Sequence, residues 1–497
     1  MILFKRYTRE FIIFTFMRLR SGSLIAIVIT LVFIISGSSC RKQARLLTTG
    51  GVLTFSDDTL KFDTVFTAAG SFTTGLLIYN TQNEPINISS VRLKNGNNSY
   101  FHINVDGFVG NAVTNIRIAA HDSVYVFATV KIDPNDTLTP FIVSDELIST
   151  LNGKDFIVPF TAYGQNAHYI VSDSLSGTTP INWLTDKPYV VEHSCVVGPG
   201  ATLNIPANCR VYMHQDARFF VFGTLNVNLT GTDSVVFQGD RLDRSYFGRR
   251  GYPGEWGGFY FVGGSTGSFN KAVIKNCGGG SFYRNFYAQP AAMQVDSGAH
   301  VTINNTIIKN SIGYGILNWQ GNVTATNCFI GTTGAEALVA LQGGFDSMTN
   351  CTFANYGDAS VSLEHRTNHT VVLLNYFQVS NTLTYYGSLD AVLRNCIVYG
   401  SLDSEIICDR VSTYPASVRL DHSLLKIGSN IDASFIHLNA CILNQDPLFK
   451  KIDENDFHLK ASSPAIGAGV NISSVDRDLE GNLRSGINDI GCYKYTP

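Results

Sequence analysis

The loop between residues 239 and 257 holds the residue types best suited to binding a ligand. Four arginines fall within ten residues, and three aromatic residues lie among or after them: Arg241, Arg244, Tyr246, Arg249, Arg250, Tyr252 and Trp256. Guanidinium groups form paired hydrogen bonds with carboxylate or sulfate, and aromatic rings stack on the faces of sugars. The loop therefore predicts binding of an acidic polysaccharide. The alternative is a solvated loop whose arginines pair with neighbouring aspartates and whose tryptophan packs on the fold.

A second cluster of reactive side chains contains Glu364, His365 and Arg366, with His369 just after them. A histidine or carboxylate base beside a stabilising cation could support β-elimination from a uronic acid, the chemistry of a polysaccharide lyase. Four polar residues on one exposed loop are also common without any catalytic role. A catalytic site is therefore the weaker reading of this cluster, and no secure catalytic set is found in the sequence.

The segment that contains Asp476, Asp478 and Glu480, followed by Gly481, has the beginning of a calcium loop. Such a loop needs a glutamate at its twelfth position, and that position is Ile487 here. A tight structural turn is therefore favoured over a calcium site. No Cys/His spacing indicates zinc, and we expect no cofactor.

A short phrase of alternating apolar residues that ends in Asn recurs along the middle of the chain. Its Asn position is occupied by Asn276, Asn305, Asn327, Asn350, Asn375 and Asn395, and then by His422. The steps between copies run from 20 to 29 residues, a period typical of stacked repeats. Alternation before each Asn indicates a strand, and the apolar phase changes after it. The Asn is therefore expected at a left-handed bend, with its amide bonded to the same amide in the next coil.

Coils of this length that contain two or three short strands predict a right-handed parallel β-helix. Four cysteines follow the Asn of a copy: Cys277, Cys328, Cys351 and Cys396. We expect them to form an inward column of free, buried thiols, because the torsion of a disulfide is hard to reach between stacked coils. Cys195 and Cys209, fourteen residues apart, either pair or are two core residues.

Residues 170–497 resemble the pectate-lyase-like right-handed β-helix proteins, and their end resembles the C-terminal segment of the choice-of-anchor Q family. The resemblance is carried by Trp183 and by the segments 186–191, 253–258, 446–449, 456–459, 463–466, 478–482 and 489–491. It implies a β-helix over 170–443 with a C-terminal segment over 444–497. The family has no single chemistry attached to it.

Residues 46–165 contain short strands separated by turns, the pattern of a β-sandwich. The motifs at 60–65, 80–88 and 162–165 resemble the Ig-like modules of the choice-of-anchor D and hydin type. Such a module is usually a spacer, which implies that it displays the β-helix away from an anchor. The predicted fold is therefore all-β, an Ig-like β-sandwich followed by a right-handed parallel β-helix.

The first 39 residues are expected to be a signal peptide, with Met17 as an alternative start. A charged segment leads into an apolar run from Leu24 to Ile35, and small residues precede Cys40. This arrangement resembles the lipobox of bacterial lipoproteins, in which the cysteine carries the lipid. We therefore expect a lipid anchor on Cys40 that holds the protein to a membrane of the cell envelope. The outer membrane is the expected location, with its periplasmic or surface face unresolved.

The composition of the chain limits the classes of function that it can have. The chain has 497 residues, of which 44% are apolar and 15% charged, so it can bury a large core. A net charge of −3 gives no general attraction to nucleic acid. Two hypotheses remain: a binding or adhesion protein for polysaccharide, which we favour, and a polysaccharide lyase or related carbohydrate-active enzyme. The sequence does not indicate an oligomeric state.

Overall fold

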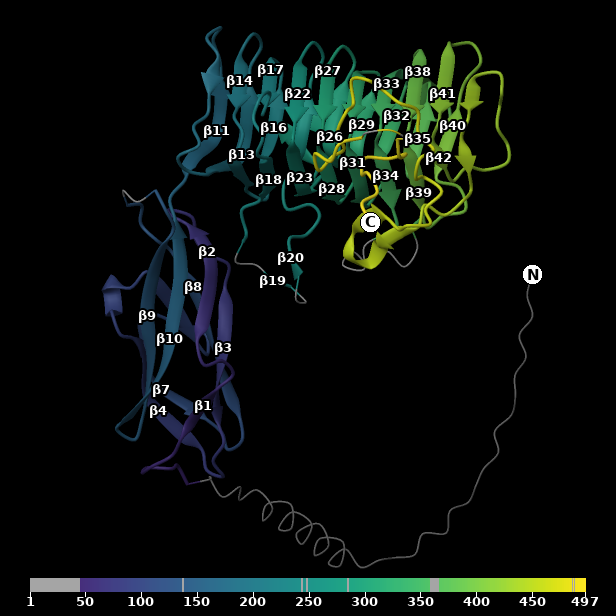
Figure 1. Ribbon diagram of the computed structural model, residues 1–497. Helices are drawn as coiled ribbons and strands as arrows, with labels where there is room; N and C mark the ends of the chain where they lie inside the picture. The colour runs from purple at the N-terminus through teal and green to yellow at the C-terminus, as the bar shows by residue number, and fades with distance from the viewer. Residues whose placement is uncertain are drawn as a thin grey trace, which may run out of the picture.

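The chain folds into two β-domains and a tail that packs back on the second domain (Figure 1). The computed structural model describes residues 45–135, 138–242, 245–246, 249–283, 286–357, 366–484, 486 and 488–497, with backbone alone at 245–246, 249–250, 281–283 and 286–287. Within these residues no helix has the length and apolar character needed to cross a membrane. Cys40 and the predicted signal peptide lie outside them, so the lipid anchor stays a prediction.

The first domain is a sandwich of two five-stranded sheets. One sheet contains β1 (Leu53–Phe55), β3 (Thr74–Asn80), β8 (Ser123–Val130), β5 (Phe101–Val105) and β6 (Phe108–Val109). The other contains β2 (Leu60–Phe66), β10 (Lys154–Gln165), β9 (Phe141–Leu151), β4 (Ile86–Leu93) and β7 (Ala112–Ile118). Buried and exposed residues alternate along strands such as β8, as expected where one face of a sheet packs on the other sheet.

The second domain is a stack of parallel coils, each with three strands that lie on three faces of the stack. One coil, for example, consists of β27 (His300–Asn304), β28 (Ile307–Ser311) and β29 (Tyr314–Trp319), and the next of β30 (Asn322–Thr326), β31 (Phe329–Thr333) and β32 (Leu338–Leu341). We call the three faces, in chain order, face 1, face 2 and face 3. The predicted parallel β-helix is confirmed, with its strands running from His168 to Leu443.

The other strands of the stack continue these faces in register. Face 1 also contains β12 (Ile181–Asn182), β14 (Thr202–Ile205), β17 (Thr224–Val227), β22 (Thr266–Asn270), β33 (Gly344–Thr349), β38 (Leu389–Arg394), β41 (Ala416–Asp421) and β43 (Ile436–Asn439). Face 2 contains β15 (Arg210–Met213), β18 (Val235–Gly239), β23 (Ala272–Cys277), β34 (Thr352–Asn355), β39 (Ile397–Gly400), β42 (Leu424–Leu425) and β44 (Ile442–Leu443). Face 3 contains β16 (Arg218–Val221), β21 (Gly258–Phe261), β26 (Ala291–Asp296), β35 (Val371–Leu374) and β40 (Ile406–Asp409). The first coils open with β11 (His168–Leu175) and β13 (Tyr189–Val197), which pairs along both faces 2 and 3.

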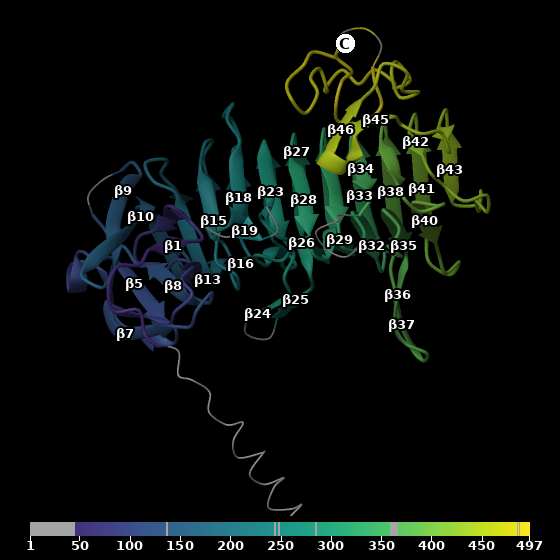
Figure 2. The same cartoon turned by 90° about the horizontal axis from the view of Figure 1, so that it is seen from below.

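Three hairpins project from the stack: β19 (Ser245–Tyr246) with β20 (Arg249–Arg250), β24 (Ser281–Tyr283) with β25 (Phe286–Ala288), and β36 (Tyr376–Ser380) with β37 (Leu383–Tyr386). The tail adds β45 (Phe449–Lys451) and β46 (Asp456–Leu459) and packs on face 2. Short 3₁₀ turns lie at Gly96–Asn98 and Ile452–Glu454. In Figure 2 the tail lies on one side of the stack, and the β24–β25 and β36–β37 hairpins lie on the opposite side.

The predicted Asn bend is confirmed at the corner between faces 1 and 2. Asn305, Asn327, Asn350, Asn395 and His422 all have left-handed backbone, with φ between 46° and 53°. The amides form ladder segments: Asn327 Nδ2 donates to Asn305 Oδ1 at 3.3 Å, and Asn395 Nδ2 donates to Asn350 Oδ1 at 3.3 Å. The bend turns the chain while the alternating apolar side chains stay inward.

Two copies of the repeat do not lie at this corner. Asn276 lies at the next corner, between faces 2 and 3, where its Oδ1 accepts a hydrogen bond from Asn310 Nδ2 at 2.7 Å. Asn375 is not left-handed and instead donates to the Val411 and Tyr414 carbonyl oxygens. The same phrase, strand then polar bend, suits more than one corner, so sequence alone assigned these copies wrongly.

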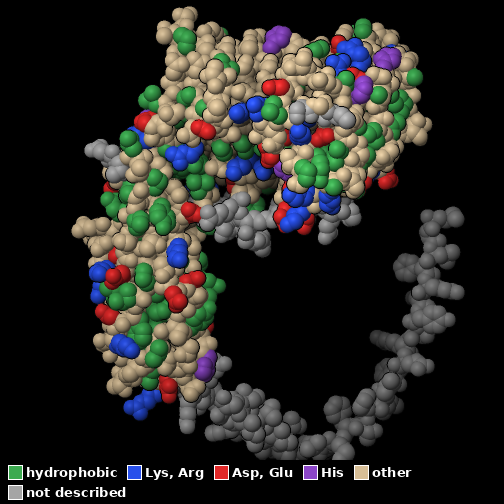
Figure 3. Space-filling model, viewed as in Figure 1, with side chains coloured by type: hydrophobic (Ala, Val, Ile, Leu, Met, Phe, Trp, Pro, Cys, Tyr) green, Lys and Arg blue, Asp and Glu red, His purple; other side chains and the backbone are tan. Residues whose placement is uncertain are grey.

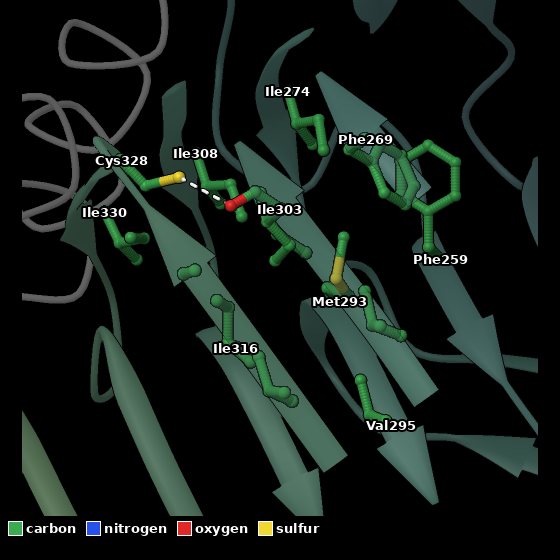
Figure 4. Packing of buried hydrophobic residues seen from close by; sticks show 14 of the residues in the cluster. Phe259, Phe269, Ile274, Met293, Val295, Ile303, Ile308, Ile316, Cys328 and Ile330 are labelled. Carbon is green, nitrogen blue, oxygen red and sulfur yellow. Dashed lines mark hydrogen bonds between the residues drawn. The ribbon is translucent and has the colours of Figure 1, made fainter. Parts of the chain in front are cut away.

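The prediction of an inward cysteine column is correct for three of its four members. Cys328, Cys351 and Cys396 are fully buried on neighbouring coils, and Figure 4 shows Cys328 Sγ bonded to the Ile303 carbonyl oxygen, at 3.5 Å. Cys277 is buried but pairs in register with Ser311 at the other corner. All nine described cysteines are free, and Cys195 and Cys209 are two buried core residues.

We expect Asn327→Leu to lower the free energy of unfolding by about 1 to 3 kcal/mol more than Asn208→Leu. Both positions have left-handed backbone, so a leucine is strained equally at each. Asn208 is exposed, whereas Asn327 bonds to Asn305 and to the Arg477 carbonyl oxygen. Urea unfolding of the two variants therefore isolates the amide bonds, and equal losses of stability would refute the ladder.

Candidate functional site

The arginine loop contributes to the junction between the domains. Arg241 Nη1 donates to the Gly70 carbonyl oxygen of the sandwich at 2.6 Å. Beside it the Phe66 and Tyr212 rings pack with centroids 4.7 Å apart, and Tyr169 Oη donates to the Thr67 carbonyl oxygen. Arg241 is therefore a contact between domains, and part of its donor capacity is already used.

Trp256 is not available to a ligand, which corrects the prediction for this residue. Its side chain is fully buried, packs edge-on against Phe259 and donates from Nε1 to the Lys275 carbonyl oxygen at 2.9 Å. Tyr252 is half-buried. Arg244 and the side chains of Tyr246, Arg249 and Arg250 lie outside the described residues, so the predicted binding of an acidic glycan by this loop stays a prediction.

Arg366 has a structural environment instead of the predicted catalytic one. Its guanidinium, 4% exposed, forms a two-pronged ion pair with the fully buried Glu405, with Nη2 to Oε2 at 2.5 Å and Nη1 to Oε1 at 2.8 Å. Glu405 also accepts from the Thr370 backbone N–H and hydroxyl. A buried guanidinium whose two terminal nitrogens pair with a buried carboxylate cannot reach a substrate. Glu364 and His365 lie outside the described residues.

The residues considered for calcium form a turn of the tail. Asp478 is buried, and its two oxygens accept hydrogen bonds from the backbone N–H groups of Glu480, Asn482 and Lys494. Glu480 pairs with His458 Nε2 at 3.2 Å, and Asp476 is exposed. No cluster of three metal-ligating side chains is found in the described part of the chain.

A groove of about 470 Å³ on face 3 is the best candidate site. Consecutive coils carry its polar and aromatic side chains outward: Tyr260, Gln289, Gln294, Asp296, Trp319, Gln320 and Gln342. Gln289 directly follows β25, and Phe377 of β36 contacts Trp319, so the groove lies between the bases of two hairpins. Face 3 provides a rigid floor because its strands pair on both sides.

Asp296 is the central titratable group of this groove. One carboxylate oxygen accepts from Tyr260 Oη at 2.5 Å and the other from Gln294 Nε2 at 2.9 Å. Burial raises the pKa of Asp296 above its ordinary value, and these two hydrogen bonds offset part of that rise. Burial and the nearby carboxylate also raise the pKa of Tyr260. Asp296 is thus a positioned carboxyl group at the edge of solvent.

Trp319 is the aromatic member of the groove. It is the register partner of Asp296 on the next strand, and Phe377 packs edge-on against it with centroids 4.6 Å apart. Its Nε1 donates to Gln342 Oε1 at 3.1 Å. The ring is half-buried and fixed in orientation by both contacts. A fixed ring next to a carboxylate and amides matches sugars, which have one apolar face and a rim of hydroxyls.

Sequence reasoning missed this site, although the coil period contained a signal for it. Asp296 and Trp319 are 23 residues apart, close to one coil, so they share a column. Single polar residues at outward positions do not stand out without the register. The hairpin 281–288, which holds the aromatic and basic residues Tyr283, Arg284 and Tyr287, ends next to Gln289 of this groove, but those side chains lie outside the described residues.

No family model and no curated protein matches the sequence. Among solved structures, the chain has a weak likeness to a family 123 glycoside hydrolase from Clostridium perfringens, with 11% identity over 22% of this chain and 25% of that one, and a TM-score of 0.17. It also has a weak likeness to the catalytic domain of a GH87 α-1,3-glucanase, with 10% identity over 76% of this chain and 89% of that one, and a TM-score of 0.23. The chain thus spans a quarter of the length of the first protein. Scores this low carry no argument about function.

Proposed function

We propose that this protein binds polysaccharide at the cell envelope and that the groove on face 3 holds the glycan. The observation that carries the proposal is Trp319, a ring held in place beside Asp296 and four glutamines. Aromatic stacking supplies contact area, while the carboxylate and amides match sugar hydroxyls. Grooves with this mixture of one rigid aromatic and a few convergent polar groups are typical ligand sites.

A neutral glycan fits this groove better than an acidic one. Its described lining contains no Lys or Arg and one carboxylate, Asp296, which would repel a uronic acid. The acidic polysaccharide predicted from the arginine loop is a separate proposal, since Arg249 and Arg250 lie on the β19–β20 hairpin and not in this lining.

A carbohydrate-active enzyme is the alternative function. The raised pKa of Asp296 suits a general acid or base, which is the observation in favour of it. Hydrolysis of a glycoside ordinarily uses two carboxyl groups, and the described lining supplies one. Binding is therefore the better-supported function. Display from a lipid on Cys40 at the outer membrane, with the sandwich as a spacer, completes the proposal.

We expect Trp319→Ala to weaken binding of a neutral oligosaccharide by about tenfold or more, the scale of a buried aromatic hot spot. Calorimetric titration with gluco-, xylo- and manno-hexasaccharides would measure it. Tyr125→Ala is the matched control, because Tyr125 is an exposed aromatic on the sandwich, far along the chain from the groove. Unchanged affinity in Trp319→Ala would refute the groove as the site, and release of reducing or unsaturated ends would favour the enzyme.

A further inference from the structure

We propose that the cleft between the tail and the corner of faces 1 and 2 is a second site for neutral glycan, so that one molecule joins two glycan chains. The inference rests on the proposed function for the groove on face 3. It gives the tail, including the turn at residues 476–481 that the sequence suggested for calcium, a role beyond covering face 2.

The cleft has a volume of about 970 Å³. Its floor is formed by outward side chains at the edge of face 1 and by the corner asparagines: Ser268, Asn270, Thr302, Asn304, Asn305, Thr326 and Asn327. One wall is the loop after β17, with Thr232 and Ser234, and the other is the tail from Ser474 to Gly481. Segments that are far apart in the sequence thus line one open cleft.

The tail wall is held in place by hydrogen bonds to the stack and within the tail. Arg484 Nη2 donates to Asn327 Oδ1 at 3.3 Å and to the Gly491 carbonyl oxygen at 2.8 Å. Further along, the Cys492 N–H donates to Thr352 Oγ1 at 3.0 Å, and Asn395 Nδ2 donates to the Val470 carbonyl oxygen at 2.8 Å. A wall fixed before the ligand arrives lowers the entropic cost of binding.

The lining chemistry indicates an uncharged, hydroxyl-rich ligand. Amides and hydroxyls dominate the floor. The amides of Asn270, Asn305 and Asn327 already bond to one another and to backbone carbonyl oxygens. The hydroxyls of Ser268, Thr302 and Thr326 therefore supply the donors and acceptors for a ligand. The cations Lys271 and Arg477 already bond to backbone carbonyl oxygens, and Asp476 and Glu480 oppose them in sign. Figure 3 likewise shows acidic and basic side chains mixed near the tail instead of a field of one sign. No electrostatic preference for an anionic or cationic ligand follows.

The cleft and the groove lie on opposite flanks of the stack. In a coil with three faces, the corner between faces 1 and 2 is opposite face 3, and Figure 2 places the tail and the two hairpins on opposite sides. A short oligosaccharide cannot reach both sites at once. Two sites on one molecule would therefore bridge separate glycan chains, which raises the avidity for a dense polysaccharide layer.

The test is the stoichiometry of the full chain titrated with the same neutral hexasaccharides. We expect the native chain to bind two sugar molecules. Each single variant, Ser268→Trp or Trp319→Ala, should bind one, and the double variant should bind none. Ser268 points outward on face 1 into the cleft. Ser347→Trp is the matched control, because Ser347 lies in the same outward column two coils beyond Thr302, outside the cleft lining. Thermal midpoints of all variants check folding.

The outcomes separate the two proposals. One site in the native chain, lost in Trp319→Ala and retained in Ser268→Trp, would overturn the cleft and leave the proposed function standing. One site in the native chain that is lost only in Ser268→Trp would instead refute the groove as a binding site. Equal losses in Ser268→Trp and Ser347→Trp would place binding on the open face and overturn the cleft, and absence of binding across the three sugars would overturn both.

Discussion

Replacing Glu405 with alanine is expected to lower the free energy of unfolding by about 3 to 5 kcal/mol, because it leaves the buried Arg366 charge without its partner. Glu405 is fully buried and accepts from Arg366, from the N–H and hydroxyl of Thr370, and from the Leu402 N–H at 2.7 Å. Among the described residues, no other carboxylate forms an ion pair with that guanidinium. Urea unfolding of the variant measures the loss.

Two further variants distinguish a buried ion pair from a general effect of truncation. Arg366→Leu with Glu405→Leu should recover much of the stability, since removing both charges removes the desolvation cost as well. Asp390→Ala breaks an exposed pair with Arg419, 2.8 Å long and nearly half exposed on both sides, and should cost less than about 1 kcal/mol. If Glu405→Ala lowers the free energy of unfolding as little as Asp390→Ala does, Arg366 reaches solvent. The predicted catalytic role of Arg366 would then have to be tested again.

The coil architecture could be predicted from sequence because it depends on local rules that repeat. Each copy of the repeat has the same alternation of apolar residues followed by a polar residue at a bend. At Asn305, Asn327, Asn350 and Asn395 the left-handed backbone is expected because Asn adopts this conformation more readily than most residues. The error at Asn276 has the same origin. Nothing local distinguishes one polar corner from the next, and only pairing with Asn310 across coils assigns it to the corner between faces 2 and 3.

The candidate site was less predictable because it depends on register and on long-range burial. The arginine loop has the densest group of ligand-binding residue types, so Trp256 was predicted to bind a ligand, but its ring lies in the core. The residues of the groove come singly from successive coils, and Asp296 gains its raised pKa from burial that sequence does not reveal. Likewise, the partner of Arg366 is 39 residues away, so its charge looked free.

A buried carboxyl group inside the stack, Asp346, should make stability depend on pH. Asp346 of β33 is fully buried between its register partners Val323 and Ala391, and neither carboxylate oxygen makes a hydrogen bond within the described residues. Burial raises the pKa of Asp346 to about 7, and the neighbouring Asn318 amide offsets only part of that rise. The ionised form is therefore strongly disfavoured in the folded protein.

The sign of the effect follows from the two protonation states. The unfolded chain releases this proton near pH 3.8, whereas the folded chain keeps it until about pH 7. Between these values the folded state binds more protons, so stability falls as pH rises, by about 4 kcal/mol in total, and then levels off above pH 7. Asp346→Asn keeps the shape and cannot ionise, so it should remove this fall. Its advantage over the native chain should be small at pH 4 and largest at pH 8.

Urea unfolding of the native chain and Asp346→Asn at pH 4, 6 and 8 gives the measurement, and Asp390→Asn on the neighbouring strand serves as the exposed control. The difference between native and variant isolates one carboxyl group, because every other titrating group is common to both. A constant difference from pH 4 to pH 8 would show that Asp346 is hydrated or paired in solution. A difference that grows with pH would instead show that the stack tolerates this group only as a neutral acid.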